Sequence, residues 1–457
     1  MNIHFKKTAI LLLAATFLAA SFSPARAQAA ARVQPTEDNI VIVIDPGHGG
    51  ENEGTIENGF LEKSMNLITA QAMYDELSLY DGVTLYMTHT EDVDMTLAER
   101  AQFAADVNAD FLFSIHYNAS VKHDLFGSEV WISSQTPFNA YGYQFGYVQM
   151  ETMRDMGLFL RGVKTKINDK GTDYYGIIRE SAKRSLPAVI IEHCHVDEIR
   201  DYPFCDTEEE QKAFGRADAL SVAKYFGLKS EALGVDYSEY AMLPDAQKDS
   251  LVLSTLADET EPDVCLAEVV NADYETGQAQ LQVTAADYDS PLIYYSYSYD
   301  GGTTFSPLQM WPGSDTLNGT YTDTFLFTLE IPSGVRPDIQ IRAYNMFDLF
   351  AESEHITTLE MFRYGEEETT PEETVSEEET EEKNTPGTTT FLPAGSDKIT
   401  EGMGQIGFLT FLIVCLILVV VLFIILLMAR ALRYGSRSRK KQRHRRNEDG
   451  DRRNQRR

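Results

Sequence analysis

The chain has 457 residues, of which 43% are hydrophobic, and this is enough apolar content for two or three globular cores. Its formal net charge is −31. Residues 430–457 carry +10 and residues 1–27 carry +3, so the rest of the chain carries −44. Such an acidic surface repels a phosphate backbone, which argues against nucleic acid as a partner.

The N-terminus has the pattern of a secretory signal peptide. Two lysines precede the apolar run "TAILLLAATFLAA", and "ARA" ends at Ala27. We therefore expect residues 1–27 to be removed and the following domain to be exported. Cys194 and Cys205 could then form a disulfide, but together with Cys265 they make an odd number, so no disulfide framework is implied.

Residues 40–228 alternate apolar runs with amphipathic runs. Five runs have the β-branched and aromatic content of strands, namely 39–45, 83–88, 110–116, 128–133 and 188–193. Apolar residues at helical spacing occur in three others, 62–80, 96–109 and 208–228. This alternation predicts an α/β domain with a mostly parallel sheet flanked by helices.

The pattern changes after a mixed polar segment, residues 229–261, which we expect to be a linker. Residues 262–360 contain short alternating strands separated by turns such as "DGGTT", which predicts an antiparallel β-sandwich. Its segments "YSYDGGTTFSPLQMW" and "IRAYN" resemble immunoglobulin-like or fibronectin-type modules of bacterial surface proteins. Residues 361–402 are rich in Glu, Thr and Pro and predict an extended acidic stalk.

The C-terminal part predicts a membrane anchor within residues 403–429. The uncharged apolar run 406–429 has 24 residues. As a helix it would span about 36 Å, enough to cross a hydrocarbon core of roughly 30 Å. The basic residues of 430–457 predict that this tail lies in the cytoplasm. We therefore expect a single-pass protein of the cell membrane with its N-terminal ectodomain outside.

Four polar residues stand where an α/β sheet forms sites. His48 follows the first predicted strand in "VIVIDPGHGG", His116 ends "DFLFSIH", Glu192 ends "LPAVIIE", and Glu62 opens a predicted helix. The carboxyl ends of the strands are the edge at which ligands bind in an open α/β sheet. Two imidazoles and one carboxylate suit a catalytic zinc ion, and a further carboxylate can act as general base.

Each of these residues also has an ordinary structural explanation. A histidine at a strand end is more often a hydrogen-bonding residue than a ligand, and Glu62 alone would be a solvated carboxylate stabilised by the helix dipole. Glu192 is harder to explain in this way, because a carboxylate that ends an apolar strand must be solvated or paired. The order and spacing of the four residues favour a metal site.

The ordered motifs closely resemble those of the zinc-dependent N-acetylmuramoyl-L-alanine amidases of the amidase-3 type. The resemblance rests on "DPGHGG", "GFLEKSMNL", "LAERAQFAADVNADFLFSIHYNAS" and "LPAVIIEH", and covers about residues 40–228. It implies that His48, Glu62 and His116 bind Zn²⁺ and that Glu192 is the catalytic base. It also implies hydrolysis of the amide between N-acetylmuramic acid and L-Ala of the stem peptide, with peptidoglycan as the partner.

The segment "VIIEHCHVDE", residues 189–198, departs from this family in its "HCH". Regular strand alternation would place Glu192 and Cys194 on one face and His193 and His195 on the other. We therefore expect both histidines to pack or to support the site, and the metal to lie at the other segments. Upstream, "THTED" replaces a more usual Thr-Arg pair, so an arginine that could contact substrate or have a structural role is missing at His89.

Three alternatives stay open. The first is a catalytically silent peptidoglycan-binding or regulatory protein, although all four site residues are retained. The second is a zinc peptidase acting within the stem peptide, which the order of the motifs disfavours. The third is an adhesin in which the β-sandwich and the stalk matter most, and this is compatible with catalysis.

Overall fold

The computed structural model describes residues 39–241 and 247–365, all within the unit of the chain that ends at Thr369. The predicted signal peptide, the stalk beyond residue 365, the predicted membrane span and the basic tail lie outside the described residues. Within those described ranges, no helix is both long and apolar enough to cross a membrane.

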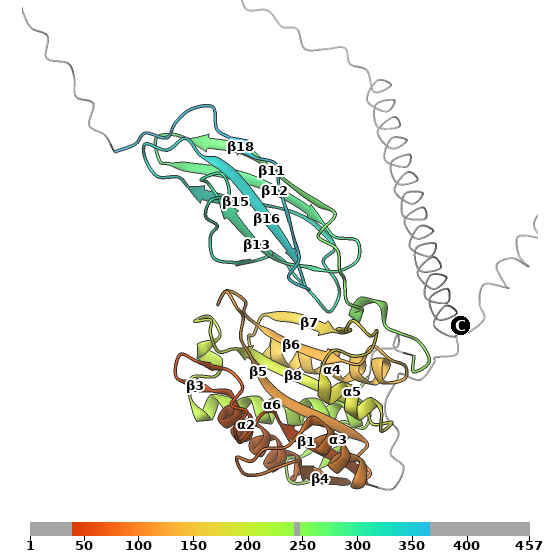
Figure 1. The fold of residues 1–457 in the computed structure, drawn as a ribbon. Coiled ribbons are helices and arrows are strands. Elements are labelled where there is room, and N and C mark those ends of the chain that lie inside the picture. The colour runs from red at the N-terminus through yellow and green to blue at the C-terminus, as the bar shows by residue number, and fades with distance from the viewer. Residues whose placement is uncertain (1–38, 242–246, 366–457) are drawn as a thin grey trace, which may run out of the picture. The chain divides into compact units, whose positions relative to one another are not determined.

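A six-stranded sheet forms the centre of the first domain (Figure 1). Its order is β4-β1-β5-β8-β6-β7, and every neighbouring pair is parallel except β6 and β8. The mostly parallel sheet is therefore confirmed. The strands are β1 (Ile40–Pro46), β4 (Val83–Met87), β5 (Phe111–Asn118), β6 (Ser128–Ile132), β7 (Leu160–Lys164) and β8 (Ala188–His195). Strand β7 was not predicted.

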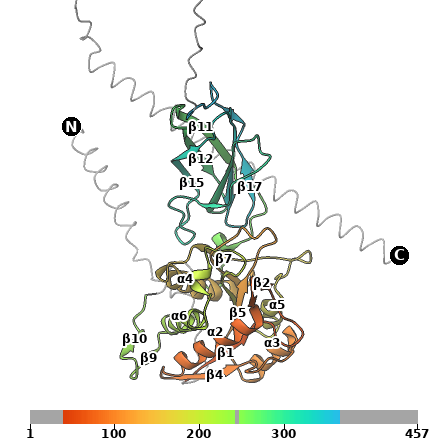
Figure 2. The same ribbon diagram turned by 90° about the vertical axis from the view of Figure 1, so that its left-hand side faces the viewer.

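Helices cover both faces of this sheet (Figure 2). One face carries α2 (Glu62–Leu77), α4 (Phe138–Asp155) and α6 (Glu208–Phe226), and the other carries α3 (Leu97–Asp106) and α5 (Gly176–Ala182). Capping boxes begin both α3 and α6, at Thr96 and Thr207. Helix α6 ends at Gly227 in the left-handed conformation. Helices α4 and α5 were not predicted.

Residues 264–364, here called the β domain, form two antiparallel sheets. One has the order β11-β12-β15, and the other has the order β14-β13-β16-β17, with β18 also pairing with β16. Alternate residues of β12 from Ala279 to Ala285 are buried, and they share one core with Ile341 of β16. The strands are β11 (Val264–Asp273), β12 (Gln278–Ala286), β13 (Leu292–Ser298), β14 (Gln309–Met310), β15 (Thr322–Glu330), β16 (Asp338–Asn345), β17 (Phe350–Glu352) and β18 (Ile356–Thr357).

The antiparallel sheets are thus confirmed, and the immunoglobulin or fibronectin assignment stays a prediction.

The segment between the two domains contains little regular secondary structure. It contains a hairpin of β9 (Lys229–Ser230) and β10 (Val235–Asp236) and the 3₁₀ turn Leu253–Thr255. The carbonyl of Thr255 accepts from the backbone N–H of Thr165 at 2.7 Å, so this turn packs on the first domain. In the first domain, β2 (Ile56–Glu57) and β3 (Phe60–Leu61) pair with each other as a short antiparallel hairpin.

Candidate metal site

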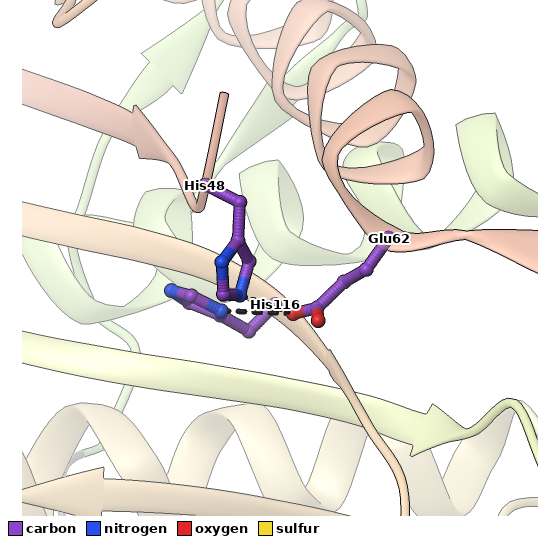
Figure 3. Close-up of side chains that lie close together, drawn as sticks. All are labelled: His48, Glu62 and His116. Atoms are coloured by element: carbon purple, nitrogen blue, oxygen red, sulfur yellow. Dashed lines mark hydrogen bonds and ion pairs between the residues drawn. The ribbon is translucent and has the colours of Figure 1, made fainter. Parts of the chain in front are cut away.

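The structure brings His48, Glu62 and His116 together from three separate elements (Figure 3). Nε2 of His48 lies 3.1 Å from Oε1 of Glu62, and Nδ1 of His116 lies 3.0 Å from the same oxygen. The three ligand atoms all lie within 4.8 Å of one another. Across residues 39–241 and 247–365, this is the one group of at least three His, Cys, Asp or Glu side chains with such spacing.

The glycine-rich turn after β1 places the first histidine. His48 itself has a φ of 64°, and Gly49 and Gly50 that follow it also have positive φ, which glycine adopts at little cost. A Cβ on Gly47 would lie 2.2 Å from the ring of His116. The turn therefore lets the rings of His48 and His116 approach to 4.9 Å between centroids, at an angle of 80°.

The buried side chain of Arg100 stabilises this turn by hydrogen bonds. Nη1 of Arg100 donates to Oδ1 of Asp45 at 2.8 Å and to the carbonyl of Pro46 at 2.6 Å, and Nη2 donates to the carbonyl of His48. Nε2 of His89 lies 3.1 Å from Nη1 of Arg100. His89, which the sequence presents as the position of a missing arginine, therefore belongs to the support of this turn.

Hydrogen bonds also fix the orientation of His48 and Glu62 through the side-chain atoms that do not face the other ligands. Nδ1 of His48 lies 2.9 Å from Oδ1 of Asn52, which orients the ring with Nε2 toward Glu62. Oε2 of Glu62 accepts from the N–H of Thr55 at 2.8 Å. Burial alone would raise the pKa of Glu62, but the hydrogen bonds of His116 and His48 outweigh it and hold this pKa far below its usual range.

Glu192 stands beside this group on the neighbouring strand. It pairs in register with His116 across β8 and β5. Its Oε2 is buried and has no hydrogen-bond partner among the residues that the structure describes. Burial raises the pKa of Glu192 well above its usual value, and the negative charges of Glu62 and Glu129 raise it further. Such a carboxylate holds a proton more tightly than an exposed one, which suits an acid–base role near neutral pH.

A cavity of about 750 Å³ opens beside the group. Its lining includes His48 and His116 together with Asp94, Leu97 and Tyr175. Leu97 begins α3 and Tyr175 immediately precedes α5, so part of the wall comes from the helices on that face of the sheet. Both the size and the open side fit a ligand-binding cleft.

Strand β8 departs from regular alternation after Glu192, where its pairing with β5 shifts register. His193 packs against Phe214 of α6, with 4.7 Å between ring centroids, and Cys194 lies in the hydrophobic cluster that contains Phe214. The prediction that His193 and Cys194 point to opposite faces is therefore wrong. Cys194 and Cys205 are both buried free thiols, so they do not form the disulfide considered above.

Neither histidine of this segment joins the metal group. Nδ1 of His193 lies 2.9 Å from the carbonyl of His116, and its Nε2 lies 2.9 Å from Oδ2 of Asp218. His193 therefore supports the strand end that carries His116. Nδ1 of His195 contacts the carbonyl of Gly127 at 3.1 Å, and burial lowers the pKa of His195 to about 3.

Two buried charged residues beside the site were not singled out in the sequence. They are Arg100 and Glu129, at 3% and 2% exposure. Oε1 of Glu129 accepts from Nδ2 of Asn118 at 2.8 Å, two residues beyond His116. The available signal was a charge inside an otherwise apolar pattern, in "LAERAQFAA" and in "SEVWIS". Such a residue is seldom buried without a partner.

Two imidazoles and one carboxylate at the carboxyl edge of an α/β sheet are typical of a metal-binding hydrolase. The family of N-acetylmuramoyl-L-alanine amidases matches residues 42–224. The amidase CwlM of Bacillus licheniformis is 30% identical over 196 residues, which are 42% of this chain and 71% of that protein. The chain therefore belongs to the N-acetylmuramoyl-L-alanine amidase family.

A second amidase and a solved amidase structure are similar to the same share of this chain. The sporulation-specific N-acetylmuramoyl-L-alanine amidase of Bacillus subtilis is 30% identical over 191 residues, covering 42% of this chain and 69% of the relative. Among solved structures, the catalytic domain of the amidase CwlV of Bacillus (Paenibacillus) polymyxa is 23% identical, with 42% of this chain and 99% of that chain covered and a TM-score of 0.37. The family match ends before the β domain.

Proposed function

We propose that this protein is an exported, membrane-anchored, zinc-dependent amidase of peptidoglycan. It would cleave the amide between N-acetylmuramic acid and L-Ala of the stem peptide. Family membership supports this reaction, because the curated relatives carry the name N-acetylmuramoyl-L-alanine amidase. The observation that carries the proposal is the group of His48, Glu62 and His116 at the wall of a cavity, with Glu192 on the adjacent strand.

The donor set fits zinc better than the hard cations. Catalytic zinc takes histidine nitrogen and carboxylate oxygen, whereas Ca²⁺ and Mg²⁺ favour oxygen ligands alone. Asn52 and Thr55 hold the outer atoms of His48 and Glu62, as is usual around a zinc site. When bound, Zn²⁺ supplies Lewis acidity toward the scissile carbonyl and lowers the pKa of a water molecule to about 7.

Glu192 is the residue that moves the proton. Its Oε2 has no hydrogen-bond partner in the described part of the chain, so it is available to accept a proton from the attacking water. The same carboxyl then returns that proton to the nitrogen of the leaving L-Ala, since its raised pKa favours the protonated form more than in an exposed glutamate. Leu97 and Tyr175 line the cavity and restrict the space open to the substrate.

The test digests purified peptidoglycan with the full-length chain and identifies the products by mass spectrometry. We expect free stem peptides that begin at L-Ala, their loss with a chelator and their return with added Zn²⁺. Glu192→Gln should lower kcat by about 10²–10⁴-fold, while the zinc content measured by elemental analysis stays the same. Glu239→Gln changes an exposed glutamate in the same way and should leave the activity unchanged.

Other products would identify the alternatives. Cleavage between two residues of the stem peptide would replace the amidase with a zinc peptidase. Retained zinc and peptidoglycan binding without any cleavage would instead indicate a silent binding protein. Each outcome contradicts the proposed reaction in a different way, so the product masses decide between them.

The membrane anchor is proposed from residues 403–429 and the basic segment 430–457. Its test is alkaline carbonate extraction of cell membranes. The full-length chain should stay in the membrane fraction, and a chain that ends at residue 402 should be released into the medium. Cell separation that is equally effective with the released form would contradict a role for the anchor and stalk in limiting the reach of the enzyme.

A further inference from the structure

A second cluster of buried charges lies at the β6–β7 edge of the sheet. Glu129 of β6 and Arg161 and Lys164 of β7 are each no more than 2% exposed. Oε2 of Glu129 lies 2.8 Å from Nε of Arg161 and also pairs with Nζ of Lys164. Within the first domain, Glu129 is the carboxylate that forms ion pairs with both cations. Burial of an uncompensated charge is costly, so a further anion in contact with Arg161 would stabilise the cluster.

The β domain supplies that anion. Both carboxylate oxygens of Asp348, in the turn between β16 and β17, accept from Nη2 of Arg161, at 3.0 and 2.8 Å. The hydroxyl of Tyr294 lies 3.1 Å from Nη1 of Arg161. Nζ of Lys164 donates to the carbonyl of Met346 at 2.8 Å. With Asp348, the cluster contains two positive and two negative side chains.

Apolar side chains surround these contacts. Phe126 of the first domain shares a hydrophobic cluster with Ile293, Tyr294, Leu308 and Met346 of the β domain. The hydroxyl of Tyr294 donates to the carbonyl of Phe126. Glu129, Arg161 and Lys164 are therefore shielded from water, and Asp348 reaches Arg161 from the rim with a side chain that is 35% exposed. Electrostatic interactions are stronger at such a shielded site than at an exposed surface.

The opposite end of the cluster reaches the candidate active site. Glu129 is paired with Glu192 across the antiparallel strands β6 and β8. The hydroxyl of Ser128 donates to the carbonyl of Glu192 at 3.0 Å. Oε1 of Glu129 accepts from Asn118, which ends the strand of His116. A displacement of Glu129 would therefore act on the two strands that carry Glu192 and His116.

We propose that the β domain is a positioning element of the amidase site, acting through Asp348 and Tyr294 on Arg161 and through Arg161 on Glu129. The kinetic part of this inference rests on the proposed function. The β domain then does more than separate the amidase from the membrane, because it completes a buried charge network next to the catalytic base.

The test replaces Asp348 with Asn in the full-length chain. Asp348 has a φ of 65°, a conformation in which Asn is as well tolerated as Asp, so the variant removes the charge without new backbone strain. We expect kcat on peptidoglycan to fall about tenfold or more, as for outer partners of a metal site, with little change in KM. Tyr294→Phe should change kcat in the same direction by less. Asp338→Asn, which removes a half-exposed carboxylate paired with His355, should change neither constant.

Hydrogen exchange of backbone amides provides a measurement that needs no activity. In Asp348→Asn we expect faster exchange in the peptides that contain β6 and β8, with β1 and β4 unchanged. If the wild-type chain cleaves no peptidoglycan, the proposed function fails, and the exchange pattern still decides this inference. Should Asp348→Asn not fold, Tyr294→Phe carries the same comparison.

Three results would overturn the inference. The first is a folded variant with unchanged kcat and unchanged exchange in β6 and β8. The second is a lower melting temperature while kcat of the folded protein stays at the wild-type value, because that would be a purely structural role. The third is an equal loss of kcat in the Asp338→Asn control.

Discussion

Replacing Arg100 with Leu is expected to lower the free energy of unfolding of the first domain by about 3–5 kcal/mol. Arg100 and Asp45 have side chains that are 3% and 1% exposed, and they pair at 2.8 Å. Without the guanidinium, the buried carboxylate of Asp45 keeps the hydroxyl donors of Thr88 and Ser114 but loses its ion-pair partner. A loss of this size is a large part of the 5–15 kcal/mol that is typical of a domain.

The variant Arg100→Lys keeps the positive charge at this position but removes the planar arrangement of donors of the guanidinium. A single ammonium cannot match the planar fork that serves Asp45, the carbonyl of Pro46 and the carbonyl of His48 at once. We expect a smaller loss of stability than in Arg100→Leu, about 1.5–3 kcal/mol, because the ammonium can still pair with the carboxylate of Asp45. Zinc affinity should fall about 10–100-fold, because Arg100 supports the turn that carries His48.

The assay is urea denaturation followed by tryptophan fluorescence. The chain has two tryptophans, Trp131 in the first domain and Trp311 in the β domain. A Trp311→Phe background therefore leaves a probe that reports on the first domain alone. Zinc affinity is measured by competition with a chelating dye. Arg216→Lys, at a surface pair with Glu209, is the matched control and should change neither quantity.

Unchanged urea midpoints and unchanged zinc affinity in Arg100→Lys would refute this reasoning. The double variant Asp45→Asn with Arg100→Leu provides a second check, because it removes both members of the buried pair. It should recover part of the stability lost in Arg100→Leu, since no unpaired charge is left inside. An additive loss in the double variant would mean that the pair does not act as a unit.

Three further predictions concern the site and its surroundings. Gly47→Ala should weaken zinc binding at least tenfold, measured with the same dye, because a Cβ there would meet the ring of His116 at 2.2 Å. Burial raises the pKa of Asp201 to about 6, so the carboxyl group of Asp201 binds a proton more tightly in the folded chain than in the unfolded chain. The free energy of unfolding should therefore fall by at most ~3 kcal/mol as the pH rises from about 4 to 6. Asp201→Asn should remove this pH dependence and be more stable above pH 6 in urea titrations, since an amide oxygen can still accept from the N–H groups of Gly127 and His195. Removal of zinc with a chelator should lower the melting temperature, and zinc at a thousand times its Kd should restore about 4 kcal/mol.

These predictions have their own controls. Gly59→Ala introduces a methyl group into open space, so any loss there measures backbone strain at its φ of 90° and not a clash. Asp75→Asn changes an exposed aspartate and should leave the pH dependence of stability as in the wild type. A wild-type stability that rises between pH 4 and 6 specifically through Asp201 would contradict the sign derived above. A melting temperature that does not respond to zinc would contradict binding at this site.

Much of the first domain could be predicted because its central strands are apolar on both faces. Residues 42–44 of β1 are fully buried, and a run of β-branched residues is the usual sequence of such a strand. The candidate site could be predicted for a related reason. Each of His48, His116 and Glu192 lies at or just beyond the carboxyl end of such a run, and parallel neighbours bring those ends to one edge of the sheet.

Strand β7 could not be predicted from its own residues. "LRGVK" contains a glycine and two cations, Arg161 and Lys164, which read as a solvated segment. The structure buries both cations because Glu129 and Asp348 lie against them, and these partners are 32 and 187 residues away from Arg161 in the chain. Local pattern carries no information about partners at such distances.

The sequence by itself determined five of the six strands of the central sheet and three of the five helices that flank it, the antiparallel character of the β domain and the four residues of the candidate site. Periodicity and strand-end position are local properties, so they could be seen without coordinates. Tertiary structure alone decided the antiparallel pairing of β6 with β8, the register shift after Glu192 and the burial of Arg100, Arg161 and Lys164. The physical reason is that an unpaired cation belongs in water, and only the folded chain shows which distant carboxylate allows it inside.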